Sequence, residues 1–393
     1  MIDFSIPPEL EQTRRQIIAF MDEHVYPAES RMDENGALPA ELRKSLQQKV
    51  KEMGLWAPHM PKDAGGMGIG VVGLALINEI LGRSPLGPGL FGCQAPDAGD
   101  QELLHLAGTP EQKKKYLAPN VAGEVRSCFA MTEPEVSGAD PVNLRCRAVL
   151  EGDTWVINGH KWFITGARGS KFAIVMAVTD PDAEPRRRFS MILLDTETPG
   201  FRILREVPVM GRGGPGGHCE ILFENCRAPK ENLLGKRGEG FKLAQARLGP
   251  GRIQHCMRWL GVAQRSFELM CRYALKREAF GGPLAEKQTV QNWIADSAVE
   301  MQAARLLTLH AAWKMDQKLD ARVEISMIKF YGARVLHDVV DRAIQVHGAL
   351  GYSQDTPLES FYREARAARI YDGPDEVHRM VVARRLLKQF KEQ

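Results

Sequence analysis

An acidic segment near the C-terminus is the strongest candidate for acid–base chemistry in this sequence of 393 residues. Segment 372–376, Asp-Gly-Pro-Asp-Glu, opens the last predicted helix. Capping alone could explain it, with Asp372 or Gly373 as the N-cap, Pro374 in the first turn and two acids at the positive helix end. The alternative is a carboxylate base held at the helix start and facing a cavity. The local sequence by itself favours the capping interpretation.

Other familiar catalytic patterns are missing or stand in the wrong context. Segment 211–216 satisfies G-x-G-x-x-G, but a predicted strand at 220–223 follows it, so no helix N-terminus would receive a pyrophosphate. The ten histidines contain no H-E-x-x-H and no pair four residues apart. We therefore expect His255, His347 and His378 to pack or form hydrogen bonds, and we predict no metal site. No G-x-S-x-G nucleophile elbow occurs.

Composition and charge set the broad class. A length of 393 residues predicts two or three domains, and a net charge of +3 argues against a protein that coats nucleic acid or anionic lipid. No apolar run approaches the roughly 18–20 residues of a spanning helix, and the N-terminus does not have the pattern of a signal or transit peptide. The seven cysteines contain no C-x-x-C, which argues against a disulfide framework or structural zinc. A cytoplasmic location is expected if the protein is bacterial.

Residues 1–127 are predicted to form an N-terminal α-helical domain. Leu10, Ile17, Met21 and Val25 fall on one helical face. Thr109–Gln112 is a capping box with proline at the first helical position, so a helix should begin there.

Residues 128–235 are predicted to form a β-barrel or sandwich domain. Strands at 154–157 and 161–165 would flank a hairpin turn at Asn158-Gly159. Further strand-length apolar runs occupy 172–178, 189–194 and 220–223.

Residues 236–393 are predicted to form a C-terminal four-helix bundle. Three long helices carry apolar residues at steps of three and four, and a shorter helix would carry Val377, Val381, Leu387 and Phe390. The predicted fold class is therefore multidomain α and β, in the order helices, β, helices. Strands do not alternate with helices, which disfavours a doubly wound sheet.

Five segments in this order resemble signatures of the acyl-CoA dehydrogenase family, and the match spans nearly the whole chain. They are CFAMTEP at 128–134 with GAD at 138–140, KWFIT at 161–165, REAFG at 277–281 with Gln288, QVHGALGY at 345–352, and YDGPDE at 371–376. The finer resemblance is to family members 10 and 11, through segments 160–169, 248–258 and 372–378. The resemblance implies the three-domain acyl-CoA dehydrogenase fold.

The resemblance also implies FAD as the cofactor, bound between the β domain and the bundle. Residues implied to bind FAD in the first two segments are Phe129, Met131, Thr132, Gly138, Ala139, Phe163 and Thr165. Residues implied to reach the FAD of a neighbouring subunit are Arg277, Phe280, Gln288, Gln345, Val346, His347, Gly348 and Ala349. In the last segment Pro374 and Glu376 would contact the cofactor, and the substrate would contact Ala139, Arg252 and Gly373.

This chain departs from the family pattern at the base. The family's usual base is Glu, whereas Asp372 is one methylene shorter. A second carboxylate position used by some members is Gly251 here, so Asp372 has no rival and the resemblance reverses the capping interpretation. Ala139 stands where a serine is expected, so that hydroxyl is lost or comes from Ser137. Phe163 replaces the more common tryptophan.

The implied activity is FAD-dependent dehydrogenation of an acyl-CoA thioester, as in fatty acid β-oxidation. Asp372 would remove the pro-R α-proton while a β-hydride passes to flavin N5, giving a trans-2-enoyl-CoA. The implied partners are the acyl-CoA, an electron-transfer flavoprotein and further subunits of a homodimer or homotetramer. Nitroalkane-oxidase-like and acyl-CoA-oxidase-like enzymes of this fold stay open, as does an unfavoured DNA-binding flavoprotein. Acyl chain length, branching and hydroxylation also stay open, with long-chain or 4-hydroxyacyl substrates as possibilities.

Overall fold

The chain divides into two units in a computed structural model that describes residues 5–211, 213–214 and 216–391. The first unit draws on Met1–Ser30, Ile69–Pro88 and Gly249–Gln393, and the second on Arg31–Gly68 and Gly89–Leu248. The helix α9 (Gly240–Lys276) begins in the second unit and enters the first at Gly249. The predicted domain boundaries at 127/128 and 235/236 stay a prediction.

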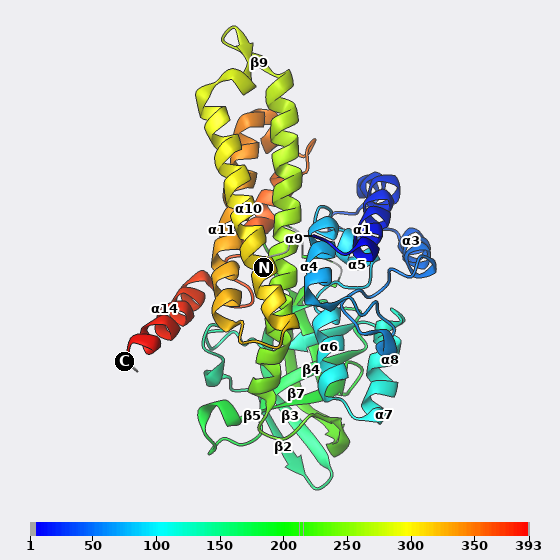
Figure 1. Cartoon of the computed structure of the whole chain (residues 1–393). Helices are drawn as coiled ribbons and strands as arrows, with labels where there is room; N and C mark the ends of the chain where they lie inside the picture. The colour runs from blue at the N-terminus through cyan, green and yellow to red at the C-terminus, as the bar shows by residue number, and fades with distance from the viewer. Residues whose placement is uncertain (1–4, 212, 215, 392–393) are drawn as a thin grey trace. The chain divides into compact units, whose positions relative to one another are not determined.

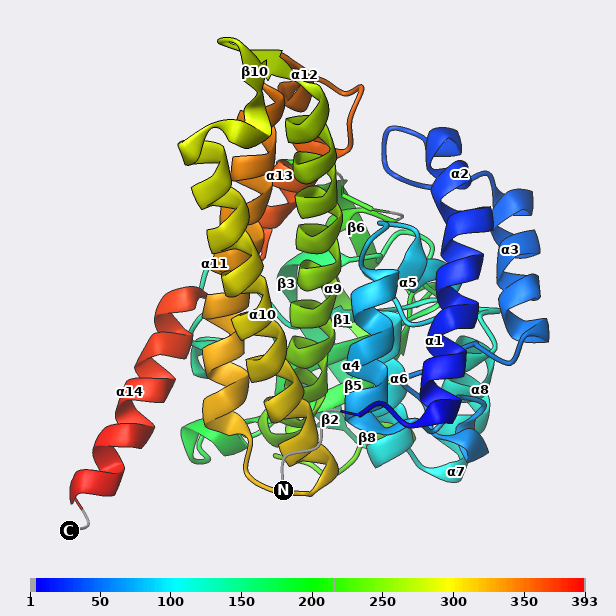
Figure 2. The same ribbon diagram turned by 45° about the horizontal axis from the view of Figure 1, so that its top comes forward.

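Long helices dominate the first unit, as predicted. Besides most of α9, its helices are α1 (Pro8–Phe20), α2 (Tyr26–Ala28), α4 (Gly70–Leu81), α10 (Gln288–Asp316), α11 (Arg322–His347), α12 (Ala349–Tyr352), α13 (Leu358–Ala367) and α14 (Asp375–Lys391). A π-helical segment, Met21–Val25, joins α1 to α2. The helices α9, α10 and α11 run side by side, and a short hairpin of β9 (Glu278–Ala279) and β10 (Gly282–Pro283) joins α9 to α10 (Figures 1 and 2).

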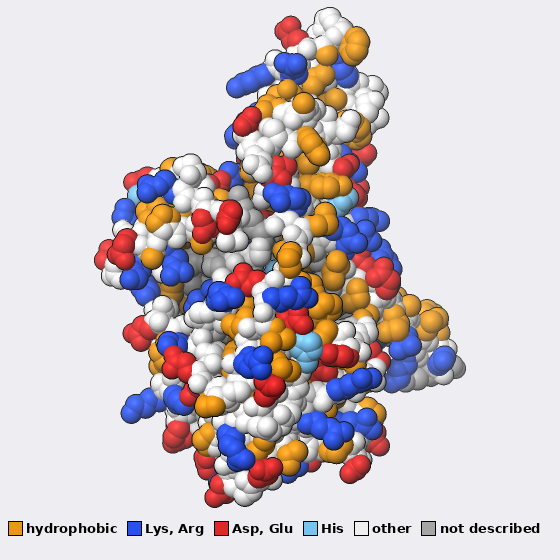
Figure 3. All heavy atoms as spheres, turned by 180° about the vertical axis from the view of Figure 1, so that it is seen from behind, with side chains coloured by type: hydrophobic (Ala, Val, Ile, Leu, Met, Phe, Trp, Pro, Cys, Tyr) orange, Lys and Arg blue, Asp and Glu red, His pale blue; other side chains and the backbone are white. Residues whose placement is uncertain are grey.

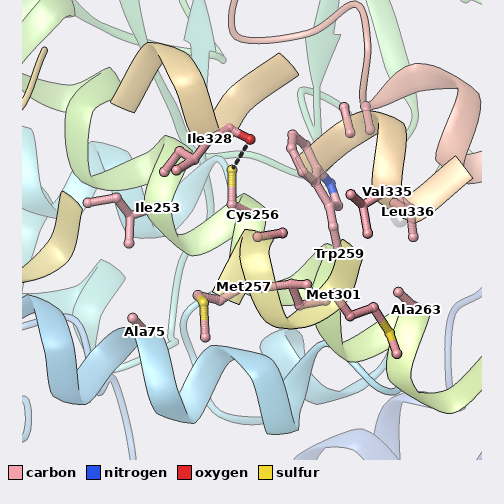
Figure 4. Packing of buried hydrophobic residues seen from close by; sticks show 14 of the residues in the cluster. Ala75, Ile253, Cys256, Met257, Trp259, Ala263, Met301, Ile328, Val335 and Leu336 are labelled. Carbon is pink, nitrogen blue, oxygen red and sulfur yellow. Dashed lines mark hydrogen bonds between the residues drawn. The ribbon is translucent and has the colours of Figure 1, made fainter. Parts of the chain in front are cut away.

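The core of this unit follows from the spacing of apolar residues on α9. Ile253, Cys256, Leu260 and Ala263 recur at steps of three and four, and all four are buried. They pack against residues of α10 and α11, including Met301 and Ile328 (Figure 4). The Cys256 thiol donates a hydrogen bond to the Ile328 carbonyl, 3.4 Å away. The long helices therefore bury one continuous apolar seam.

The last helix differs from the predicted fourth member of the bundle. Val377 and Val381 are half-buried, whereas Leu387 is 61% exposed and Phe390 is 72% exposed. Both α13 and α14 pack against α11, and the far end of α14 runs away from the bundle (Figures 1 and 2). Apolar and basic side chains gather on that end (Figure 3). The predicted seam was wrong for the second half of α14, because its periodicity alone does not say which partner covers it.

The second unit joins helices to a sheet. Its helices are α3 (Ala40–Glu52), α5 (Gly87–Leu90, at the boundary), α6 (Asp97–Ala107), α7 (Pro110–Gln112) and α8 (Ala118–Val121). The predicted capping box is confirmed at Thr109, whose hydroxyl accepts from Gln112 N while the Gln112 side chain accepts from Thr109 N. A π-helical segment, Lys113–Leu117, continues this element to α8.

The sheet has eight strands in the order β6-β7-β3-β2-β4-β5-β8, with β1 parallel to β4. The strands are β1 (Ser127–Ala130), β2 (Arg147–Glu151), β3 (Thr154–Thr165), β4 (Phe172–Val178), β5 (Phe189–Asp195), β6 (Phe201–Glu206), β7 (His218–Pro229) and β8 (Leu233–Leu234). The central strand β4 sends alternate residues into two apolar clusters, one with Ala173 and Val175 and the other with Phe172 and Ile174. Both faces of the sheet are therefore covered.

The hairpin predicted at Asn158-Gly159 was wrong. These residues lie inside β3, where the register to β7 shifts between Ile157 and Gly159. A Cβ on Gly159 would come within 2.6 Å of Cys146, so the glycine permits a close approach of chains instead of a turn. The chain turns at Gly152, with φ +60, between β2 and β3.

Several other predictions have a structural outcome. Of the residues predicted on one helical face, Ile17, Met21 and Val25 are buried and Leu10 is half-buried. Segment 211–216 contains two residues, 212 and 215, outside the described ones, and the strand β7 follows it as predicted. Within the described residues, no helix is long and apolar enough to cross a membrane. No group of three or more potential metal-binding side chains is placed to hold an ion in that part of the chain.

Candidate active site

The candidate base stands just before α14, outside the helix. The helix begins at Asp375, and the Pro374 carbonyl accepts from the N–H groups of Val377 and His378. The prediction that Asp372 or Gly373 would serve as the N-cap was therefore wrong. Asp372 instead adopts a positive φ of +54 and Gly373 follows with +100.

The backbone of Asp372 is held by side chains from two helices. Arg252 Nε on α9 donates to the Asp372 carbonyl at 2.9 Å. His378 Nε2 on α14 lies 3.1 Å from the same oxygen, and because a carbonyl can only accept, this nitrogen carries the hydrogen. A Cβ on Gly373 would lie 2.8 Å from His378 Nε2, so this close contact requires glycine.

A buried lysine on α11 holds the carbonyls on either side of the base. Lys329 is 0% exposed, and its Nζ donates to the carbonyls of Ala368 at 2.7 Å and Gly373 at 3.1 Å. The ammonium also lies 5.3 Å from the Trp259 ring centre and 5.5 Å from that of Tyr371, within cation–π range. Burial lowers the pKa of Lys329 from its ordinary value, although nearby Asp372 opposes that shift.

The carboxylate of Asp372 faces a histidine. His255 Nε2 on α9 lies 3.4 Å from Asp372 Oδ2, and the two side chains are 21% and 23% exposed. The His255 ring also lies 5.0 Å from the Tyr371 ring and stacks on Trp259 at 6.2 Å. Trp259 Nε1 donates to the Tyr371 hydroxyl at 2.7 Å. The candidate base is thus partly accessible to solvent, and the rings of His255, Tyr371 and Trp259 lie beside it.

Burial and neighbouring charges shift the pKa values of the groups around this loop. Burial lowers the pKa of Arg252, and burial together with the Arg252 charge lowers the pKa of His378 to about 4. His378 is therefore neutral near pH 7, and its buried Nδ1 has no hydrogen-bond partner among the described residues. Asp375 is 1% exposed and accepts from Arg369 Nε at 2.7 Å.

In the second unit, a buried ion pair fixes the signature segment after β1. Lys161 Nζ donates to Glu133 Oε1 at 2.8 Å and to the Met131 carbonyl at 2.7 Å. Both Glu133 oxygens also accept backbone N–H groups, from Arg145 at 2.6 Å and Cys146 at 2.9 Å. Every oxygen of this buried carboxylate is thus hydrogen-bonded.

The predicted flavin residues of this unit sit beside that pair. Thr132 Oγ1 donates to the Trp162 carbonyl at 2.6 Å, so its hydroxyl retains only acceptor capacity for a ligand. Phe163 has a positive φ of +53 and is 43% exposed, so part of this aromatic residue is open to solvent. Thr165 Oγ1 lies 3.0 Å from His218 Nδ1. The Arg247 guanidinium lies over the ring of Phe129, 4.3 Å from the ring centre.

The remaining residues of that predicted set lie on an exposed loop. Gly138 and Ala139 are exposed there, and Ala139 N donates to Ser137 Oγ at 3.3 Å. The Ser137 hydroxyl oxygen therefore serves this turn, while its hydrogen can still be donated elsewhere.

A third set gathers at the hairpin end of the first unit. Phe280 is 99% exposed with φ +53, and Arg277 and Gln288 are exposed beside it. His347 stacks on Tyr273 of α9 at 4.3 Å and donates from Nδ1 to the Ala343 carbonyl at 2.7 Å.

The end of α11 completes this set. Gly348 has φ +60, and nothing lies within 4 Å of the place a Cβ would occupy. Gln345 and Ala349 are exposed, whereas Val346 is buried. The structure therefore brings the third and fourth signature segments together at one end of the bundle, away from Asp372.

Comparison with known proteins identifies the family. Its N-terminal, middle and C-terminal domain profiles match residues 7–124, 128–226 and 238–387. The chain belongs to the acyl-CoA dehydrogenase family. The Mycobacterium tuberculosis protein FadE2, named as an acyl-CoA dehydrogenase, is 44% identical over 99% of this chain and 98% of its own length. Mouse acyl-CoA dehydrogenase family member 10 is 41% identical over 98% of this chain, which spans only 37% of that longer protein.

Solved structures agree with this assignment. A Mycobacterium abscessus protein described as an acyl-CoA dehydrogenase superposes with a TM-score of 0.93 at 40% identity, covering 98% of this chain and 100% of its own. The FAD complex of PigA superposes with a TM-score of 0.89 at 26% identity, covering 98% and 99%. The predicted fold class and family are confirmed. The chain is an FAD-dependent oxidoreductase of the acyl-CoA dehydrogenase family.

The described residues suit this cofactor. Phe163 and Phe280 are exposed aromatic residues, a type suited to stacking on flat rings, and the open space at Gly348 leaves room for a phosphate beside the backbone. Arg277 is exposed and offers a planar fork for a diphosphate. These positions are fitted to FAD by type and exposure, and their individual roles stay predictions.

Sequence reasoning missed Lys329 and the contact of His255 with Asp372. Lys329 sits one residue after Ile328 on the buried face of a predicted helix, and a lysine there is a signal that could have been used. His255 stands three residues after Arg252, on the same helical face. His378 was expected to form hydrogen bonds, and it does so with Asp372.

Proposed function

We propose that this protein dehydrogenates an acyl-CoA thioester between Cα and Cβ, with Asp372 as the base. The observation that carries the proposal is the Asp372 carboxylate, which is 23% exposed on a loop whose backbone Arg252, His378 and Lys329 hold. A fixed, accessible carboxylate can take a proton from a carbon placed against it.

The chemistry divides between cofactor and protein. FAD, which residues such as Phe163, Thr165 and Arg277 would hold, would supply the oxidant that accepts the β-hydrogen as a hydride. The Asp372 carboxylate takes the α-proton, so the product is a trans-2-enoyl-CoA. Enolate-like charge develops on the thioester oxygen, and hydrogen-bond donors placed there would stabilise it. Arg252 and the Gly373 backbone would position the thioester beside Asp372, and Pro374 and Glu376 would lie toward the cofactor.

The two predicted cofactor-binding regions of the bundle suggest a shared site between subunits. Arg252 lies on α9 and Arg277 directly follows the last residue of that helix, 25 positions later, which corresponds to about 37 Å of helix. A residue set so distant from Asp372 is suited to the cofactor of another subunit. We therefore propose a homodimer or homotetramer in which Arg277, Phe280, Gln288 and segment 345–349 bind the neighbouring FAD.

We also propose an electron-transfer flavoprotein as the acceptor. Molecular oxygen would take that role in an oxidase, so the two assignments differ in oxygen consumption. A series of acyl-CoA thioesters, each tested anaerobically for bleaching of the flavin absorbance, would identify the preferred class.

The base is tested by Asp372→Asn, which keeps the size of the side chain and removes its basicity. Bleaching by the best acyl-CoA should slow by about a thousandfold or more, because a positioned base contributes an effect of that order. FAD content and the flavin spectrum should stay unchanged, which separates loss of chemistry from loss of cofactor. Bleaching at the wild-type rate in this variant would reject Asp372. Wild-type protein that bleaches with no acyl-CoA would reject the activity.

A further inference from the structure

We propose that His255 is a positioning residue that orients the Asp372 carboxylate for proton abstraction. Its Nε2 would hold Oδ2 of Asp372, leaving Oδ1 to take the α-proton of the substrate. The inference rests on the proposed role of Asp372 and adds a second residue to it. His255 keeps its own proton throughout, so the step transfers one proton, from the substrate carbon to Oδ1.

The contacts with the Asp372 loop fix its backbone but leave the side-chain rotamer of Asp372 for His255 to select. The Asp372 backbone is held at its carbonyl by Arg252 and His378, and the next carbonyl is held by Lys329. The carboxylate can then move only by rotation about its two side-chain bonds. His255 Nε2, at 3.4 Å from Oδ2, stands where it can select one of these rotamers.

His255 is itself held in place. Its ring lies against Tyr371 at 5.0 Å and stacks on Trp259 at 6.2 Å, and those two residues are joined by a hydrogen bond. Its helix, α9, is buried along the face that carries Cys256 and Leu260. Because Arg252 precedes it by one turn on the same helix, one rigid element contacts both the backbone and the carboxylate of the base.

The other charged groups near the loop do not perform this task. Arg252 and Lys329 donate to backbone carbonyls, neutral His378 does the same, and the Asp375 carboxylate pairs with Arg369. The Cys256 thiol donates to Ile328. Among the described residues, the ionisable side chain that lies within ion-pair distance of the Asp372 carboxylate is that of His255.

The short side chain of Asp372 makes this contact consequential. An aspartate has fewer rotatable bonds than a glutamate. A rotation that displaces its reactive oxygen from the substrate α-hydrogen therefore cannot be corrected by a second adjustment along the side chain. Misplacement by a fraction of an ångström to one ångström can slow a reaction strongly. Loss of His255 should therefore slow deprotonation while substrate binding changes little.

The test compares His255→Leu with His255→Gln in the FAD-loaded protein. Gln can place its amide N–H near the position of Nε2, whereas Leu fills space without a donor. The probes are 3-thia-acyl-CoA thioesters, which have α-hydrogens but no β-hydrogen to lose, so α-exchange in D2O reports deprotonation alone. We expect His255→Leu to slow exchange about 30-fold with the dissociation constant within about threefold, and His255→Gln to recover most of that loss.

Controls separate the possible failures. His310→Leu removes an exposed histidine stacked on Trp313 and should leave exchange unchanged. If Asp372→Asn stops exchange while His255→Leu exchanges at the wild-type rate, the positioning role is wrong and the base assignment survives. If both His255 variants slow exchange equally, a donor at this position is not what matters and the inference is overturned. If Asp372→Asn exchanges normally, the proposed base itself is wrong.

Discussion

Two fully buried lysines, one in each unit, perform opposite tasks. Lys161 in the β-sheet unit pairs with Glu133, whose carboxylate gathers two backbone N–H groups. Lys329 in the helical unit donates to two backbone carbonyls beside Asp372, with no carboxylate recorded in ion-pair distance within the described residues. The first lysine is neutralised by its partner, and the second brings a net positive charge to a loop.

The difference shows two ways to fix an irregular segment. In the signature segment the buried Glu133 carboxylate accepts hydrogen bonds from backbone N–H groups, and Lys161 neutralises its charge. In the Asp372 loop a buried cation donates to the chain, and the nearby acid is left accessible. A structural pair needs no exposure, whereas a base must keep one face open. We therefore expect mutations of the first lysine to affect stability and mutations of the second to affect chemistry more.

The largest expected effect is on folding, from Lys161→Met. This change leaves Glu133 buried without its cation, and breaking a buried pair in this way costs about 3–5 kcal/mol of the free energy of unfolding. Urea unfolding followed by circular dichroism measures it. Lys171→Met, which removes an exposed partner of Glu197, is the control and should leave the unfolding midpoint unchanged. A Lys161→Met protein as stable as wild type would remove the contrast between the two lysines.

Lys329→Met should destabilise less and slow the reaction more. Two carbonyls lose a donor, at about 1–3 kcal/mol for each unsatisfied group, but the removed charge was itself costly to bury. We expect a net loss of about 2–3 kcal/mol in urea unfolding. Flavin bleaching by acyl-CoA should slow by more than about tenfold in the folded protein, because the loop loses its support. Equal rates of bleaching in the Lys161 and Lys329 variants would contradict the comparison.

The smallest expected effect is on the pH dependence of the free energy of unfolding, and it arises from His378 beside the Asp372 loop. Burial and Arg252 lower the pKa of His378 to about 4, so the unfolded chain binds a proton between that value and about 6.5 while the folded chain does not. The stability from neutral His378 is therefore complete above about pH 6.5 and is lost as the pH falls toward 4.

This loss should amount to about 2 kcal/mol between pH 7 and pH 5. Unfolding in urea at both pH values measures it in wild type and in His378→Asn, whose amide does not titrate. The variant should be less stable at pH 7 and should show a weaker loss on acidification. A wild-type protein with the same pH dependence as His378→Asn would show that this histidine does not titrate differently on folding.

The accuracy of the sequence-based predictions varied with the range of the interactions involved. The seam of α9 and the capping box at Thr109 were predicted, because a period of 3.6 residues and a local hydrogen bond are both properties of neighbouring residues. The turn at Asn158-Gly159 was mispredicted, because the glycine is required by the close approach of Cys146, which is not a neighbour in the sequence. The exposed end of α14 was mispredicted too, since periodicity marks an apolar face but not its partner.

The candidate site shows the same division. The resemblance of five short segments singled out Asp372 and the cofactor positions, and those assignments depend on residue type and order alone. The contacts of Lys329, His255 and His378 with the loop could not be read from the sequence, because each joins residues far apart on different elements, such as Lys329 and Ala368, 39 positions apart.

The sequence by itself determined the family, the cofactor class, the order of helical and β segments, and the identity of the candidate base. These follow from local patterns and signatures that each occupy a few adjacent residues. Only the tertiary structure decided that Asp372 stands outside its helix with a positive φ, next to a glycine carbonyl that a buried ammonium holds, and facing an imidazole. Packing sets those contacts, because the apolar seam of α9 and α11 fixes where Arg252, His255 and Lys329 meet the loop.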